Sequence, residues 1–205
     1  MYMFRNFVFM TMINLLPYDG LALYYGRIIP DEEAGVMFKN LLATIAWKHE
    51  EAIVYGRHII TKRKAAWYGN KAYSYTYSKI TKEAFPWTKD LLLIKRTAEE
   101  KTGETFNSCL LNLYHDGEEG MGWHSDNESS IEKESAIASV SFGADRMFSF
   151  RHKKTKEIVS VLLESGSLLL MKDTTQQHWY HSLPKSKKIK EARINLTFRC
   201  MKESV

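Results

Sequence analysis

Apolar residues recur at helical spacing in one segment near the start of the chain. Intervals of three and four residues place such positions on one side of a helix, where they can face a core. The positions concerned are Met37, Leu41, Leu42 and Ile45. Asp31 and two further acidic residues precede them. The pattern therefore predicts a helix that has Asp31 as its N-cap and a negatively charged first turn.

A second helix is predicted from about Trp87 to Lys101, because Pro86 stands near its start and Gly103 just past its end. Beyond Gly103 the apolar residues come in short runs that are typical of strands. The predicted strands are Ser108–Tyr114, Ala136–Phe142, Met147–His152, Ile158–Leu163, Ser167–Lys172 and Ile194–Cys200. Helices followed by strands predict an α+β fold, with the helices packed on an antiparallel sheet or jelly roll.

Composition narrows the class of protein. The chain has 205 residues, of which 44% are hydrophobic, enough for one sizeable core. Cys109 and Cys200 are the only cysteines and form no CxxC pair, so a zinc ribbon or disulfide framework is not indicated and a reducing compartment fits best. No apolar run is long enough to span a membrane. The formal net charge of +5 and the pI near 9.0 permit a nucleic-acid partner without requiring one.

His124-Ser-Asp126 is the first candidate for chemistry. Residues i and i+2 of an extended chain point to the same side, so this imidazole and carboxylate can face one cavity. With a later histidine they would form the two-His, one-carboxylate triad that leaves open positions on Fe(II). His178 and His181 are the candidates for the third ligand, and at most one is expected to bind, since they face opposite ways on an extended chain. His181 is favoured because a short loop joins it to the strand discussed next, and His178 is expected to be packed or hydrogen-bonded.

The last predicted strand alternates strictly between polar and apolar residues. Its polar face carries Arg193, Asn195, Thr197 and Arg199. The two arginines stand roughly 20 Å apart along the strand, so they cannot grip the same carboxylate. One would reach the far end of a cosubstrate and the other the end near the metal. Asn112 and Tyr114 share a strand face in the same way and can donate to a carboxylate or keto oxygen. Ordinary half-buried strands with a solvated basic face are the alternative. Together with the triad, the pattern indicates an iron enzyme with an oxo-acid cosubstrate.

The segment from Tyr55 to Lys82 contains many aromatic and many basic residues. Cations contact phosphates, and aromatic rings stack on unpaired or flipped bases. Tyr73, Tyr75 and Tyr77 are spaced to line one strand face. A β-hairpin that covers the core with its lysines solvated explains the segment equally well.

Taken together, five ordered segments resemble the AlkB family of Fe(II)- and 2-oxoglutarate-dependent dioxygenases over about Pro30 to Arg199. They are Asn112–Tyr114, Met121–Asp126, Ala138–Gly143, His178–Pro184 and Arg193–Arg199. The resemblance implies a double-stranded β-helix, or jelly roll, with a nucleotide-recognition lid before it. It implies a single dioxygenase domain over residues 1–205, with an N-terminal extension (1–20), a lid (about 50–85) and a catalytic core (about 105–200).

The resemblance also assigns roles to residues. His124, Asp126 and His181 match the iron ligands. Positions around 2-oxoglutarate are matched by Asn112, Tyr114, Arg193, Asn195, Thr197 and Arg199. The lid looks most like the branch that repairs double-stranded DNA, with Tyr55 at the tip of a wedge hairpin and Arg63-Lys64 near the DNA. Tyr75, Tyr77 and Ser78 match the base pocket, and Glu128 stands where an acidic residue can contact the target base. Tyr55 is less apolar than the Phe common at that tip, and Ala65 and Trp67 depart from the branch.

The expected activity is oxidative demethylation of bases such as 1-methyladenine and 3-methylcytosine in DNA, with release of formaldehyde, succinate and CO2. Fe(II), 2-oxoglutarate and O2 are the expected cofactors and cosubstrates, with ascorbate as the reductant in vitro. A monomer is expected, cytoplasmic in a bacterium or nuclear in a eukaryote. The alternatives are an RNA demethylase or protein hydroxylase of the same chemistry, a non-catalytic nucleic-acid-binding jelly roll, and a zinc hydrolase.

Overall fold

The computed structural model describes residues 13–54, 57–77 and 80–202, with the backbone alone described at 51–54, 57–59, 74–77 and 80–82. Tyr55 and Ser78 lie outside the described residues. The described part is mostly β with few helices. Its helices are α1 (Asp31–Thr44), α2 (Lys89–Thr102) and the short α3 (Thr175–His178).

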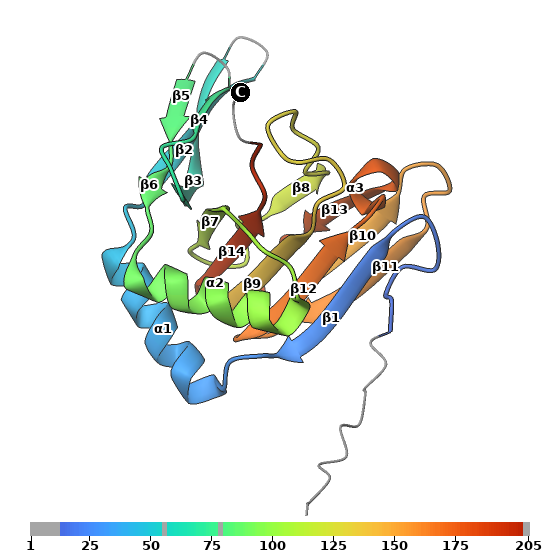
Figure 1. The fold of residues 1–205 in the computed structure, drawn as a ribbon, viewed down its shortest axis with the longest axis horizontal. Coiled ribbons are helices and arrows are strands. Elements are labelled where there is room, and N and C mark those ends of the chain that lie inside the picture. Colours follow the sequence, from blue (N-terminus) through green and yellow to red (C-terminus); the bar gives the residue numbers. More distant parts are fainter. Residues whose placement is uncertain (1–12, 55–56, 78–79, 203–205) are drawn as a thin grey trace, which may run out of the picture.

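Two antiparallel sheets form the body of the molecule, as expected of a double-stranded β-helix (Figure 1). The larger one runs in the order β1 (Leu21–Arg27), β12 (Ser167–Lys172), β9 (Ile137–Gly143), β14 (Arg193–Arg199), β7 (Ser108–Tyr114), β3 (Arg57–Gly69) and β2 (Lys48–Val54), and β6 (Phe85–Pro86) pairs parallel to the end of β3. The smaller one runs β11 (Ile158–Leu163), β10 (Arg146–His152), β13 (Trp179–Leu183) and β8 (Met121–His124).

A separate hairpin consists of β4 (Ser74–Tyr77) and β5 (Ile80–Glu83). It rises beyond the larger sheet beside the ends of β2 and β3 (Figure 1). Tyr73 precedes β4 rather than belonging to it. Its buried ring stacks on Trp67 of β3 with 6.2 Å between centroids. The expectation that Tyr73, Tyr75 and Tyr77 share one strand is therefore wrong for Tyr73.

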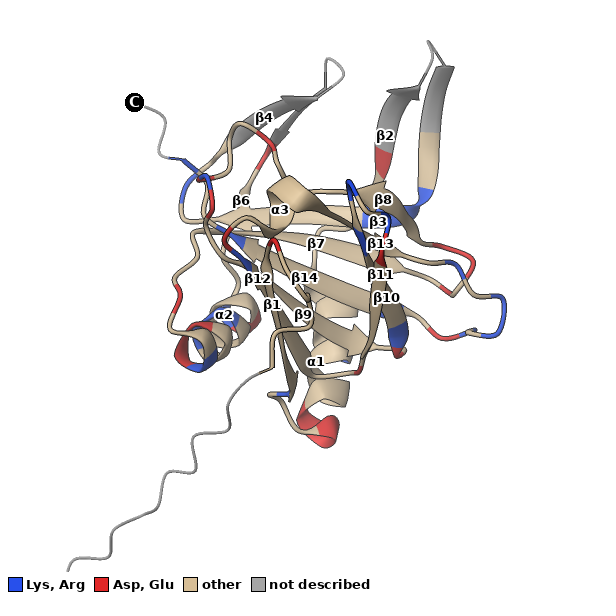
Figure 2. Cartoon of the chain, turned by 90° about the vertical axis from the view of Figure 1, so that its right-hand side faces the viewer, with Lys and Arg blue, Asp and Glu red and all other residues tan. Residues whose placement is uncertain are grey.

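Two apolar cores follow from the alternation of the strands. Helices α1 and α2 cover one face of the larger sheet, where Ile194, Leu196 and Phe198 of β14 pack against Leu41 and Ile94. Between the two sheets a second core forms around Trp179 and Phe150 and includes Tyr114, Ile137, Leu163 and Leu169. The polar face of β14 points toward this second layer. Charged residues gather on loops and helix surfaces, and the strands of the larger sheet are mostly uncharged (Figure 2).

The predicted helices are present with changes at their ends. Pro30 occupies the N-cap of α1 and supplies no side-chain acceptor, so the expected Asp31 cap is wrong. Asp31 is instead the first helical residue and pairs with Arg27. Leu42, which was expected on the side of the helix that faces the core, is 44% exposed. The second helix begins two residues later than predicted, because Thr88 caps it. It ends just before Gly103, and this glycine adopts the left-handed conformation.

The predicted strands are confirmed within one residue at their ends. The sequence pattern missed β1, β6, β8 and β13, and it indicated no more than a possible hairpin where β2 to β5 lie. Residues before β1 also join the fold, since Leu16 is buried in the second core. The described residues include no helix with the length and hydropathy that a membrane span requires.

Candidate metal centre and cosubstrate cavity

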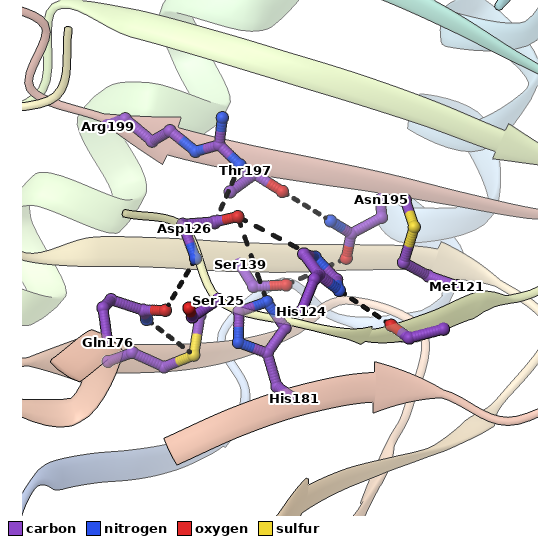
Figure 3. Close-up of polar contacts among 12 residues, drawn as sticks. Met121, His124, Ser125, Asp126, Ser139, Gln176, His181, Asn195, Thr197 and Arg199 are labelled. Atoms are coloured by element: carbon purple, nitrogen blue, oxygen red, sulfur yellow. Dashed lines mark hydrogen bonds and ion pairs between the residues drawn. The ribbon is translucent and has the colours of Figure 1, made fainter. Parts of the chain in front are cut away.

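Two neighbouring strands bring the histidines of the triad together. His181 of β13 is the direct cross-strand partner of His124 of β8, so both imidazoles lie on one face of the smaller sheet, with 4.2 Å between ring centroids. Asp126 follows β8 by two residues. Its Oδ1 lies 3.8 Å from His124 Nε2 and 4.0 Å from His181 Nε2 (Figure 3). The three ligand atoms, one from each residue, all lie within 4.8 Å of one another. This donor set and spacing suit an iron ion.

The charges around the triad favour a metal ion. Burial raises the pKa of the Asp126 carboxyl, but Arg199 and the two histidines outweigh it and lower that pKa below its usual value. Arg199 Nη2 lies 2.7 Å from Asp126 Oδ2, which leaves Oδ1 facing the histidines. Burial lowers the pKa of His181 to about 4 against the opposing effect of Asp126, so its imidazole is neutral at physiological pH. A deprotonated carboxylate and a neutral imidazole are the forms that bind metal.

Hydrogen bonds orient the ligands from behind. His124 Nδ1 lies 2.9 Å from the Gly122 carbonyl, and donation to that oxygen leaves Nε2 free as a lone-pair donor. Gln176 accepts a hydrogen bond from the Asp126 backbone N–H at 2.9 Å. Lys153 Nζ donates to the Gln176 carbonyl at 2.8 Å and contacts Ser125 Oγ at 3.2 Å. The loop that carries Asp126 is thus attached to α3 by Gln176 and to β10 by Lys153.

A small cavity of about 70 Å³ extends from the triad along the polar face of β14. Arg193 is buried there and donates to Ser141 Oγ at 2.9 Å and to Asn195 Oδ1 at 2.8 Å. Asn195 in turn donates to Thr197 Oγ1 at 2.8 Å. Burial lowers the pKa of Arg193 to about 10, which still leaves the guanidinium charged at neutral pH.

The cavity contains polar atoms without protein partners. Arg193 Nε, Arg199 Nε and Asn112 Oδ1 are buried and make no hydrogen bond within the described residues. Unpaired buried polar groups cost free energy unless something binds them. One cationic group, Arg193, lies away from the triad, and the other, Arg199, lies beside it. This arrangement fits a dicarboxylate with a metal-chelating end. The residues present therefore suit both iron and 2-oxoglutarate.

A second, larger cavity of about 490 Å³ adjoins the triad. Leu110, His124 and Arg199 line both cavities, so they form the wall between them. The other walls of the larger cavity include Trp67, the exposed Glu128 and the apolar side chains of Ile131 and Met201. An aromatic ring and a carboxylate beside the metal site provide a place for a flat cationic group.

The residues predicted to contact the substrate differ in where they lie and in how much of them the structure describes. Arg63 faces inward: it pairs with Glu50, donates to Met121 Sδ at 3.2 Å and has its guanidinium 5.9 Å from the centre of the Tyr114 ring. Lys64 is half-buried on β3. Tyr75 and Tyr77 are placed only by the backbone of β4.

His178, which was expected to be packed or hydrogen-bonded, is exposed at the end of α3.

Several residues of the site were not predicted from the sequence. Gln176 and Trp67 touch the site but carry no motif of their own, and Ser139 and Ser141 lie within a segment noted only for resemblance. The alternating pattern of β9 could have indicated that its two serines face the polar side of β14, with which β9 pairs.

Comparisons with known proteins agree with this geometry. The model of the 2OG-Fe(II) oxygenase superfamily matches residues 21–199. The mouse DNA oxidative demethylase ALKBH2 is 39% identical over 192 residues, which cover 88% of this chain and 80% of the relative. The bovine alpha-ketoglutarate-dependent dioxygenase alkB homolog 3 is 42% identical over 178 residues, or 82% of this chain and 62% of the relative. The chain is an AlkB-family 2-oxoglutarate/Fe(II) dioxygenase.

A solved structure supports the fold of this dioxygenase. OsALKBH1 aligns with a TM-score of 0.61 over 90% of this chain and 99% of that chain, at 14% identity. Fe(II) and 2-oxoglutarate are implied by the family, and the His124–Asp126–His181 triad fits the iron. Relatives of both the ALKBH2 and the alkB homolog 3 type match at similar identity.

Proposed function

We propose that this AlkB-family chain removes N-methyl groups from alkylated nucleic-acid bases, with DNA carrying 1-methyladenine or 3-methylcytosine as its substrate. One observation carries the proposal: the triad lies at the junction of a polar cavity suited to 2-oxoglutarate and a larger cavity with an aromatic and acidic lining. The similarity to ALKBH2, a DNA oxidative demethylase, supports the choice of DNA.

The ligands of the iron are proposed to be His124, Asp126 and His181. When bound, iron and 2-oxoglutarate would supply the oxidation of the methyl carbon by O2: one oxygen atom of O2 would enter succinate as CO2 is lost, and the other would leave with the methyl carbon as formaldehyde. The part of the protein is to hold the reactants in place and to exclude water.

Each polar residue of the small cavity has a proposed part in binding 2-oxoglutarate. Arg193, at the far end, binds the distal carboxylate by a charge-assisted hydrogen bond, and Ser141 and Asn195 hold its guanidinium in place. Asn112 and Tyr114 donate to cosubstrate oxygens, with Thr197 holding the Asn195 amide. Arg199 serves the metal end, where it also keeps Asp126 ionised.

The larger cavity is proposed to receive the flipped base. A methylated adenine or cytosine of this kind carries a positive charge, so Glu128 attracts it by Coulomb interaction and Trp67 by stacking and cation–π contact. Such bases have lost their pairing and cost less to flip. Tyr75, Tyr77 and Ser78 belong to the proposed nucleotide-recognition lid around this cavity. Arg63 and Lys64 belong to the part of the lid proposed to lie near the DNA.

The proposed role of the lid in binding double-stranded DNA has its own test. Tyr55, as a wedge that fills the gap left by the flipped base, should matter only in a duplex. Tyr55→Ala should therefore reduce turnover on double strands at least several-fold more than on single strands. Trp67→Ala should reduce turnover on both, since it lines the cavity itself. An equal loss on both substrates with Tyr55→Ala would remove the wedge and leave the double-strand preference without support.

Further features belong to the same proposal. The chain is proposed to act as a single dioxygenase domain over residues 1–205 and as a monomer, with ascorbate keeping iron reduced in vitro. Its compartment is proposed to be the one that holds the DNA, cytoplasm in a bacterium or nucleus in a eukaryote.

Mass spectrometry of methylated oligonucleotides tests the function. Single- and double-stranded 1-methyladenine oligonucleotides are incubated with protein, Fe(II), 2-oxoglutarate and ascorbate. The expected result is loss of one CH2 unit per lesion that requires 2-oxoglutarate and is absent in Asp126→Ala, which lacks the only anionic ligand. If 2-oxoglutarate is converted to succinate while every lesion remains, in DNA and then in RNA, the nucleic-acid substrate is wrong and a protein side chain takes its place.

A further inference from the structure

A second group of metal-ligand side chains lies outside the cavities described above. Asp19 precedes β1, His152 is the last residue of β10, and His178 is the last residue of α3. Three segments far apart in sequence each contribute one ligand atom, and these three atoms lie within 4.8 Å of one another. None of the three residues lines the iron or base cavities.

The buried member of this group has an unpaired nitrogen. His152 is 3% exposed, and its Nε2 has no hydrogen-bond partner within the described residues. Asp19 Oδ2 nevertheless lies only 3.3 Å from it. The two atoms are close enough for a hydrogen bond, yet the geometry of one is not met between them.

That separation matches a shared metal ion. Zn²⁺ binds imidazole nitrogen and carboxylate oxygen at about 2.0–2.1 Å, and a tetrahedral angle then separates the two ligands by about 3.3 Å. The corresponding separations in the iron triad are wider, 3.8 and 4.0 Å. The Asp19–His152 pair is therefore at least as close to a metal-binding separation as the two pairs of the triad.

The other nitrogen of His152 is held by Thr155. Nδ1 accepts a hydrogen bond from the Thr155 backbone N–H at 3.0 Å and lies 2.9 Å from Thr155 Oγ1. Without a metal ion the ring proton is therefore on Nε2, the atom that faces Asp19. A metal ion that binds Nε2 must shift this proton to Nδ1, where it can donate to the Thr155 hydroxyl oxygen, and this change of tautomer lowers the affinity of the site.

We propose that Asp19, His152 and His178 form a second metal site, which takes a divalent transition metal of the Zn²⁺ class. Two imidazoles and one carboxylate suit Zn²⁺, Ni²⁺ or Cu²⁺ rather than Mg²⁺ or Ca²⁺, which prefer oxygen ligands. Asp19 and His178 are exposed, so water completes the coordination and the ion exchanges with solvent. Binding ties the segment before β1 to the ends of β10 and α3.

Neighbouring cations set the expected affinity. Lys153, Lys154 and Lys156 lie in the turn after His152. Lys153 Nζ is directed to the Asp126 loop, and Lys156 Nζ donates to the Lys153 carbonyl, so both side chains have partners. Their charges weaken the binding of a cation without occupying its place. The site should therefore bind more weakly than a closed structural zinc site.

Zinc titration calorimetry of the full chain, free of any histidine tag, tests the proposal. Iron-site binding is removed by His124→Ala combined with Asp126→Ala, and ZnCl2 is titrated into this background. One equivalent should still bind. Adding Asp19→Asn or His178→Ala should weaken that binding at least tenfold. Both residues are exposed, and Asn tolerates the left-handed backbone of Asp19, so the fold is expected to survive.

The control is His115→Ala, another exposed histidine, which pairs with Glu119 away from the group. It should leave zinc binding unchanged. A background variant that binds no zinc would overturn the proposal, as would binding that neither Asp19→Asn nor His178→Ala weakens threefold. Because the readout is binding in a protein without its iron ligands, the result is independent of the proposed demethylase activity.

Discussion

At the scale of single residues, Asp126 connects most of the site. Its Oδ2 meets Arg199, its Oδ1 faces both histidines, and its backbone N–H meets Gln176 (Figure 3). The three metal ligands could be predicted because the spacing of His124 and Asp126 and the resemblance both point to them. Gln176 could not, since a lone glutamine has no pattern and its contact is to a backbone group 50 residues away.

Gln176 should act as a positioning residue for the iron ligand. Gln176→Ala removes the acceptor of the Asp126 N–H, so the carboxylate should be less well oriented and Fe(II) affinity should fall about tenfold. The measurement is the Fe(II) concentration for half-maximal turnover, read beside the KM for 2-oxoglutarate, which should change little. Gln177→Ala is the matched control, because its amide only donates to the exposed Glu134. Equal Fe(II) requirements in the two variants would remove this role.

Arg193 should determine affinity for 2-oxoglutarate. Arg193→Lys keeps the charge but loses the planar fork, so the KM for 2-oxoglutarate should rise by about tenfold or more, the equivalent of roughly 1.5–3 kcal/mol for a charged hydrogen bond. Steady-state succinate formation measures it.

The matched control is Arg146→Lys. Arg146 is equally buried but donates to the carbonyls of Asp116, Glu119 and Pro184 outside the cavity. That variant should lose stability while its KM for 2-oxoglutarate stays near the original value. An unchanged KM in Arg193→Lys would refute the distal-carboxylate assignment.

At the scale of elements, the register of short strands builds the site. The pairing of β8 with β13 sets His124 opposite His181, and the pairing of β14 with β7 sets Asn195 opposite Asn112. The alternation of β14 was readable in the sequence because its apolar face is continuous. Strands β8 and β13 were not, because their residues serve the site and so break the apolar pattern. The cap of α1 was mispredicted for a different reason: Pro30, which has no side-chain acceptor, occupies the N-cap position, and Asp31 is the first helical residue.

The cap of α2 makes a prediction about stability alone. Thr88 Oγ1 accepts from the Leu91 N–H at 3.2 Å, so Thr88→Ala should lower the free energy of unfolding by about 1 kcal/mol. For a chain of this size the Tm should fall by roughly 2–4 °C. Thr97→Ala, on the exposed face of the same helix, is the control and should have a smaller effect. A Tm unchanged by Thr88→Ala would show that packing alone holds this helix end.

At the scale of the whole molecule, the fold separates support from chemistry. Helices α1 and α2 cover one face of the larger sheet, and the smaller sheet covers the other, so both reactant cavities open between and beside the sheets. The two-layer architecture followed from helices and strands in the sequence. The junction of the two cavities did not, because it depends on side chains from several strands and a loop that meet only in space.

The central claim is that 2-oxoglutarate oxidation at the triad is coupled to demethylation of a nucleic-acid base. Its most direct test is to quantify succinate, formaldehyde and repaired base in one reaction on a 3-methylcytosine oligonucleotide. The account predicts equal amounts of all three, and none of them with Asp126→Ala. Succinate that forms at the same rate without any repaired base, or repaired base that forms without 2-oxoglutarate, would contradict it.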